Sequence, residues 1–119
     1  GKTAVVTGST AGIGKAIAQA LVDEGATVVV NGRDAERTQA AAESIKGAGR
    51  AIAVHGDVGS TDGAAEFLER LKSVGEIDIL VNNAGIFQPQ PFFEIPDEEW
   101  LRFFEVNVMS GVRLSRALA

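Results

Sequence analysis

The sequence predicts a doubly wound α/β fold built on a parallel sheet. Three observations predict it. Short β-branched runs alternate with segments of helical period, the first run enters a glycine-rich turn, and the intervening segments are too long for hairpins. Strands joined by crossover helices pair in parallel through right-handed connections. We therefore expect a three-layer arrangement with strand order 3-2-1-4, which is incomplete because a full fold of this class has a second half.

Four segments are expected to be strands, and a helix-length segment follows each of them. The strands are expected at residues 3–7, 26–31, 50–58 and 77–85. The single histidine, His55, lies in the third of these and is interpreted as an ordinary strand residue.

The first two helices are expected between the first three strands. The first ends at Gly25, and its core-facing residues follow the spacing i, i+3, i+4, i+7, i+8. These residues are Ile13, Ala16, Ile17, Ala20 and Leu21. The second begins at Asp34, whose carboxylate can cap free N–H groups, and fades by Gly47 or Gly49.

The third helix is expected within residues 60–75, with Ser60 or Thr61 as cap and Gly75 as its end. Its core-facing residues are Ala64, Leu68 and Leu71. Residues 86–95 are loop-like, and 96–119 are typical of one long helix that opens with proline and acids. The apolar face of that helix comprises Trp100, Phe103, Phe104, Gly111, Leu114 and Leu118.

Composition excludes several classes of function. The chain has 119 residues, 45% of them hydrophobic and 23% charged, which suits one globular domain. The absence of cysteine and the lone histidine argue against a metal site, and a net charge of −5 without a long basic run argues against nucleic-acid binding. No apolar run could span a membrane, and a first strand near Thr3 leaves no room for a signal peptide. We expect a cytoplasmic protein with small-molecule partners.

Residues 6–16, "VTGSTAGIGKA", connect the first strand to the first helix. A Walker A loop is excluded because Ala16 follows Gly14-Lys15 and Ser9 replaces the first glycine. The three-glycine dinucleotide fingerprint fits only in part, since Ile17 stands at its third glycine. The remaining pattern, T-G-x-x-x-G-x-G, can still bring a pyrophosphate to a helix N-terminus. A tight turn with no ligand is the alternative.

With three further motifs, this loop resembles the short-chain dehydrogenase/reductase family. The motifs are "TGSTAGIG" 7–14, "GDV" 56–58, "NNAG" 82–85 and "VNV" 106–108, in the family's order. The resemblance implies a Rossmann-type NAD(P)-binding domain over residues 1–119. It also implies an oxidoreductase that transfers hydride between a nicotinamide dinucleotide and an alcohol or carbonyl substrate.

The resemblance also assigns cofactor-binding roles. The phosphates would be lined by Gly8, Ser9, Thr10, Gly12, Ile13 and Gly14. Asp57 would accept a hydrogen bond from the adenine amino group and Val58 would bound the ring, although an Asp at a strand end also suits an ordinary turn. Asn82, with Asn83, Ala84 and Gly85, would tie the fourth strand to its neighbours and pass under the ribose.

The end of the second strand favours NADP over NAD. Asn31 occupies the position of the acid that holds a ribose 2′-hydroxyl, and Arg33 follows two residues later. A guanidinium can bind a 2′-phosphate through two hydrogen bonds. Asp34 is explained by its role as a helix cap, and Ala11 offers no second basic group.

Asn107 is the catalytic candidate. It lies within the apolar face of the last helix, where a buried amide needs partners. The family implies a catalytic tetrad member that bends the helix and holds a water of the proton relay. A satisfied core asparagine is the alternative.

The other tetrad members are a serine, a tyrosine and a lysine, and the chain contains no tyrosine. We therefore expect the chain alone to be inactive. The open edge at 79–81 and the helix 96–119 favour a homo-oligomer. A non-catalytic dinucleotide sensor or assembly module, and an isolated half-fold without a ligand, remain as alternatives.

Overall fold

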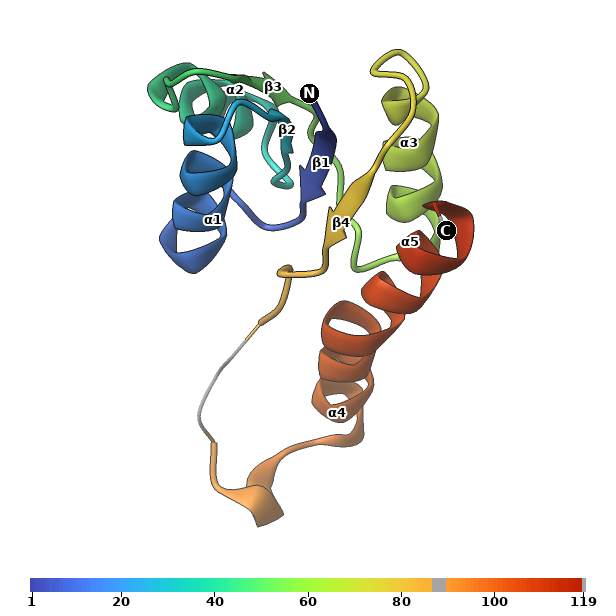
Figure 1. Cartoon of the computed structure of the whole chain (residues 1–119). Helices are drawn as coiled ribbons and strands as arrows, with labels where there is room; N and C mark the ends of the chain where they lie inside the picture. The colour runs from blue at the N-terminus through green and yellow to red at the C-terminus, as the bar shows by residue number, and fades with distance from the viewer. Residues whose placement is uncertain (87–89, 119) are drawn as a thin grey trace.

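The computed structural model describes residues 1–86 and 90–118. Its strands form one parallel sheet in the order β3-β2-β1-β4, which confirms the predicted topology (Figure 1). The strands are β1 (Thr3–Val6), β2 (Thr27–Val30), β3 (Arg50–Ala53) and β4 (Ile79–Val81). The predicted strands 50–58 and 77–85 are too long at their carboxyl ends, because those residues form the loops beyond the sheet.

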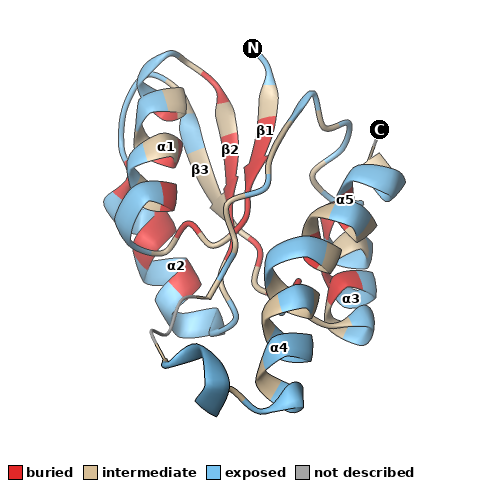
Figure 2. Ribbon diagram, turned by 90° about the horizontal axis from the view of Figure 1, so that it is seen from below, coloured by how far each residue is buried: buried red, intermediate tan, exposed pale blue. Residues whose placement is uncertain are grey.

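Helices cover both faces of the sheet, which makes the three layers expected from the sequence (Figures 1 and 2). The helices α1 (Gly12–Asp23) and α2 (Ala35–Ser44) pack on one face, and α3 (Thr61–Leu71) and α5 (Ser110–Leu118) pack on the other. Successive strand residues alternate between the layers: Ala4 and Val6 contact the first pair of helices, and Val5 contacts the second.

The predicted core face of α1 is partly wrong. Ile13 is 76% exposed, and Ala16 and Ala20 are also exposed. The buried residues are Gly14, Ala18 and Val22, with Ile17 and Leu21 packed beside them. Gly14 lies against the preceding turn, with no room for a Cβ, so the helix face that begins with Gly14 packs inward and Ile13 points away from it.

The helix caps predicted for α2 and α3 are confirmed. The Arg37 N–H donates to the Asp34 carboxylate at 2.9 Å, and the Gly63 N–H donates to the Ser60 hydroxyl at 3.0 Å. The helix α2 ends at Ser44, before the glycines expected to end it. The core residues of α3 are Ala64, Phe67 and Leu71, while Leu68 is only partly buried.

The last segment is not one regular helix. A 3-10 turn (Phe92–Glu94) precedes α4 (Asp97–Phe104), and a π-helical turn (Glu105–Met109) separates α4 from α5. The expected loop 86–95 includes residues 87–89, which lie outside the described part of the chain.

The predicted apolar face of this last segment is buried only near its end. Leu114 is fully buried, but Trp100 is 46% and Phe104 52% exposed. Figure 1 shows α4 extending beyond the sheet, and Trp100 packs there against Phe92 of the 3-10 turn, with ring centroids 5.5 Å apart. Among the described residues, no helix combines the length and apolar character needed to cross a membrane.

Candidate functional site

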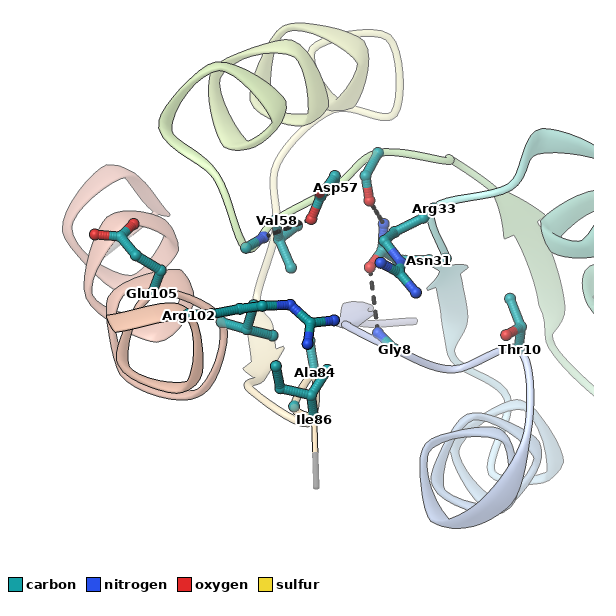
Figure 3. Close-up of a pocket in the computed structure, with 15 residues that line it drawn as sticks. Gly8, Thr10, Asn31, Arg33, Asp57, Val58, Ala84, Ile86, Arg102 and Glu105 are labelled. Carbon is teal, nitrogen blue, oxygen red and sulfur yellow. Dashed lines mark hydrogen bonds between the residues drawn. The ribbon is translucent and has the colours of Figure 1, made fainter. Parts of the chain in front are cut away.

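A cavity of about 350 Å³ opens at the carboxyl ends of the strands. The chain runs from β1 through β2 to β3 on one side of β1 and then crosses to β4 on the other side, so the strand order reverses at β1. Ligands of open α/β sheets bind at such switch points. The lining residues come from the loops after all four strands, from α4 and from the π-helical turn (Figure 3). They are Gly8, Thr10, Asn31, Gly32, Arg33, Gly56, Asp57, Val58, Gly59, Ala84, Gly85, Ile86, Arg102, Glu105 and Val106.

The glycine turn leads from β1 to the N-terminus of α1. Gly8 and Gly12 have positive φ angles of 62° and 60°, a region that favours glycine. A Cβ on Gly14 would lie 2.4 Å from Asn83 Nδ2 and 2.5 Å from the Gly8 oxygen. The turn therefore depends on glycine for conformation at two positions and for space at the third.

The N-terminus of α1 is open to a ligand. Ala11 occupies the N-cap position, and no side chain among the described residues caps the helix. The first N–H groups and the positive end of the helix dipole therefore face outward, beside the exposed Ile13. This arrangement fits a phosphate group.

Ser9 supports the turn from inside. Its side chain is fully buried, and its hydroxyl donates to the Val6 oxygen at 2.7 Å and accepts from the Asn31 N–H at 2.9 Å. The Ser9 N–H donates to the Asn31 oxygen at 2.8 Å. Thr10, by contrast, lines the cavity. Of these two residues expected at the phosphates, the structure brings only Thr10 to the cavity wall.

Thr7 joins β1 to the loop after β4. Its hydroxyl accepts from the N–H groups of Asn83 at 3.1 Å and Ala84 at 2.9 Å. The Asn83 side-chain amide donates to the Thr7 and Gly8 oxygens at 3.2 and 3.1 Å. Ala84 and Gly85 line the cavity, and Asn83 lies behind it. Thr7 was not among the predicted site residues, although the threonine before the motif glycine was a usable signal.

Arg33 and Asn31 differ in their relation to the cavity. Asn31 is 1% exposed and its amide is held between strand ends, whereas Arg33 is exposed on the cavity wall (Figure 3). A neighbouring hollow is lined by Thr10, Arg33, Asp34 and Arg37. Two guanidinium groups therefore border the surface beyond the end of β2. Arg37 was not predicted to belong to the site.

Asp57 and Val58 form the opposite wall. The Asp57 carboxylate accepts from the Gly59 N–H at 3.0 Å through Oδ1 and is otherwise exposed, so one oxygen is bound in a turn. Val58 is 4% exposed and provides an apolar floor. The turn interpretation and the ligand-binding interpretation of Asp57 are therefore compatible.

Asn107 lies in the π-helical turn and contacts the loop after β4. Its Oδ1 accepts from the Ile86 N–H at 2.6 Å, and its Nδ2 donates to the Ile86 oxygen at 3.0 Å. The expectation that Asn107 is buried is wrong, because it is exposed and α4 and its π turn project past the sheet. The expected need for hydrogen-bond partners is nevertheless met by the backbone of Ile86. Inserted π turns are frequent at functional sites.

Arg102 extends from α4 into the cavity (Figure 3). Its ion pair with Glu99 is 3.6 Å long, and its side chain is 49% exposed. Glu105 also lines the cavity, but its carboxylate pairs with Arg113 one helical segment away. No local motif marked Arg102, since only the packing of α4 brings it to the strand ends.

A family model described as short chain dehydrogenase matches residues 2–119. Over 119 residues the chain is 50% identical to an uncharacterized oxidoreductase, YvaG, of Bacillus subtilis (strain 168), with 98% of this chain and 44% of the relative covered. The chain therefore spans less than half of that relative's length.

Two solved structures have the same architecture. One is L-sorbose reductase from Gluconobacter frateurii complexed with NADPH and L-sorbose, with a TM-score of 0.92, 42% identity, and coverage of 99% of this chain and 46% of that one. The other is a Pseudomonas aeruginosa RhlG/NADP complex, with a TM-score of 0.92, 34% identity and the same coverage. The motifs, the sheet order and these matches agree. The chain belongs to the short-chain dehydrogenase/reductase family.

Proposed function

We propose that the complete protein transfers a hydride between NADP(H) and an alcohol or carbonyl substrate, and that this chain supplies the cofactor-binding half. The observation that carries the proposal is the cavity itself. It brings the glycine turn, Arg33, the Asp57–Val58 wall and the Ala84–Gly85 loop together at the switch point of the sheet. A nicotinamide dinucleotide, when bound, supplies the hydride chemistry, and the protein supplies binding and orientation.

The proposed binding of the cofactor phosphates depends on the N-terminus of α1. Its uncapped N–H groups would donate hydrogen bonds to the pyrophosphate, and the glycines allow the backbone to approach it. Hydrogen bonds from Asn83 and Ala84 to Thr7 hold this turn against the loop after β4, so that the N–H donors keep one orientation before any ligand binds. Preorganised donors bind an anion without losing free energy to reordering.

Preference for NADP rests on Arg33. Its guanidinium lines the cavity and the neighbouring hollow, and Arg37 borders the same hollow. Both can bind a 2′-phosphate, which carries more negative charge than the hydroxyl of NAD. The two solved structures described above are complexes with NADPH or NADP, which supports the same preference.

Asn107 is proposed as this chain's contribution to the catalytic group. Its amide holds the Ile86 backbone through both its donor and its acceptor, so it orients the loop that forms one side of the cavity. The chain has no tyrosine. The family's tyrosine, lysine and serine would have to come from outside these residues, and the chain alone is expected to be inactive.

We also propose that the protein assembles with a second copy of itself. Apolar side chains recur along the outer side of α4, the π turn and α5, and exposed apolar stripes mark interaction surfaces. These side chains are Leu101 (66% exposed), Phe104 (52%), Val108 (45%) and Val112 (43%).

The proposal is tested with the full-length protein. Binding of NADPH and NADH is measured by calorimetry, and oxidation of NADPH is followed at its absorbance band with a panel of small ketones and aldehydes. We expect NADPH to bind more tightly and to be oxidised with at least one carbonyl. Failure of both cofactors to bind would refute the proposal. Tight binding without turnover on any carbonyl or alcohol would favour a dinucleotide sensor instead.

A further inference from the structure

Asn31 directly follows the carboxyl end of β2, and every polar atom of its buried side chain forms a hydrogen bond. Its Oδ1 accepts from the Gly8 N–H at 3.2 Å, and its Nδ2 donates to the oxygens of Val54 at 3.3 Å and Gly56 at 3.2 Å (Figure 3). Its backbone exchanges hydrogen bonds with Ser9. At 1% exposure it offers little surface to a ligand.

These bonds connect the two walls of the cavity. Gly8 follows β1 and Gly56 follows β3, and β2 lies between those strands, so the two walls do not pair directly. The Asn31 amide spans the gap from the middle strand. It therefore sets the distance between the glycine turn and the Asp57–Val58 wall.

We infer that Asn31 is a positioning residue for the cofactor site: its amide holds the two walls of the cavity together and does not contact the ribose. This inference rests on the proposed function, because it concerns the binding of the same cofactor. It assigns discrimination between NADP and NAD to Arg33 and gives Asn31 an equal effect on both.

The chemistry of the amide carries the inference. Asparagine presents an acceptor to Gly8 and a double donor to two carbonyl oxygens. An aspartate has the same size but no donor when ionised. It would keep the hydrogen bond from the Gly8 N–H, but its second oxygen would face the Val54 and Gly56 carbonyl oxygens. The buried negative charge would then be repelled by both carbonyl oxygens, and each of them would lose its hydrogen-bond donor.

The inference and a direct ribose contact predict different outcomes for Asn31→Asp. If position 31 faced the ribose, the new carboxylate would strengthen NAD binding and weaken NADP binding. If Asn31 positions the walls, both affinities fall by about tenfold to a hundredfold and their ratio stays the same. The KM for NADPH then rises while kcat at saturating cofactor is retained.

The test measures the dissociation constants of NADP⁺ and NAD⁺ calorimetrically on full-length protein, well below the melting temperature found by circular dichroism. Gln39→Glu makes the same chemical change on the exposed side of α2 and is expected to leave both constants unchanged. Arg33→Ala is expected to change the ratio, which shows that the assay detects discrimination.

A gain in NAD⁺ affinity in Asn31→Asp, or unchanged constants in a folded variant, would overturn the inference. If Asn31→Asp does not fold, Asn31→Ser is measured instead and should lower both affinities at an unchanged ratio. Its neutral hydroxyl is too short to connect the glycine turn with the Asp57–Val58 wall, and it buries no charge. If the unmodified protein binds neither dinucleotide, the proposed function fails. If the unmodified protein binds NADP⁺ but Asn31→Asp changes the ratio of the NADP⁺ and NAD⁺ affinities, the inference is wrong and the proposed function stands.

Discussion

Asn83 donates two hydrogen bonds to Thr7: the Asn83 N–H donates to the Thr7 hydroxyl at 3.1 Å, and the Asn83 side-chain amide donates to the Thr7 backbone oxygen at 3.2 Å. The two residues are 76 positions apart in the chain and end adjacent strands. Because Asn83 also binds the Gly8 oxygen, this pair holds the glycine turn in place. The proposed cofactor site therefore depends on a contact outside the cavity wall.

Removing the Thr7 hydroxyl should loosen this contact. In Thr7→Val the Ala84 N–H loses its acceptor, while the Asn83 N–H keeps the Val81 oxygen at 3.1 Å, and an unsatisfied buried donor costs about 1–3 kcal/mol. We expect a lower free energy of unfolding, measured by urea denaturation, and weaker NADPH binding. Thr7→Ser keeps the hydroxyl and should restore most of both. Equal stability of the valine and serine variants would contradict the assignment.

Gly14 should not accept a side chain. In Gly14→Ala the Cβ would overlap Asn83 Nδ2 and the Gly8 oxygen, so the turn must move. We expect about 1–3 kcal/mol of destabilisation and loss of NADPH binding, measured by thermal unfolding with and without the cofactor.

Gly111→Ala is the matched control, since its Cβ would meet Asn82 no closer than 3.5 Å. Alanine is a better helix former than glycine by about 1 kcal/mol, so this variant should be as stable as the parent or more so. Destabilisation of both variants to the same degree would show that the clash at Gly14 does not matter.

Arg33→Ala should weaken the preference for NADPH over NADH. Removal of a guanidinium from a phosphate contact costs about 1.5–3 kcal/mol, which corresponds to about tenfold or more in affinity. The ratio of kcat/KM for the two cofactors measures the change. Lys72→Ala removes a cation from an exposed ion pair with Glu69 and should leave the ratio unaltered. If Arg33→Ala leaves the ratio of kcat/KM for NADPH and NADH unchanged, Arg33 does not determine the cofactor preference.

Asn107→Ala should reduce turnover more than stability. The side chain is exposed, so its loss costs little packing, but the Ile86 backbone loses both of its partners. We expect kcat to fall by about tenfold or more while the melting temperature changes by only a few degrees. Steady-state kinetics and calorimetry measure the two effects. A variant with full kcat would show that Asn107 has only a structural role.

Phe104→Glu should weaken assembly. Phe104 is 52% exposed within the apolar stripe along α4 and α5, and a charge there opposes burial against a second copy. Sedimentation should show a smaller species or a higher dissociation constant. Glu36→Gln, on the exposed surface of α2 across the sheet from the stripe, should sediment like the parent. A parent protein that is monomeric at all concentrations would refute the proposed assembly.

Some features could be predicted because they depend on neighbours in the chain. Asp34 and Ser60 cap helices through residues three positions away, so the sequence near each helix start was sufficient. The sheet order followed from the crossover lengths and the family's motifs. The exposure of Ile13 and Asn107 could not be predicted in this way, because periodicity identifies an apolar stripe without indicating whether another element covers it.

The sequence by itself determined the parallel α/β order, the glycine turn and the family. The alternation of strands and helices, the turns between them and the spacing of the motifs all depend on residue types that lie close together in the chain. Only the tertiary structure decided the remaining placements. Asn31 is buried between strand ends, Arg37 borders the hollow beside Arg33, and Arg102 reaches the cavity from α4. Those placements depend on how segments far apart in the chain pack together, and no local pattern encodes that packing.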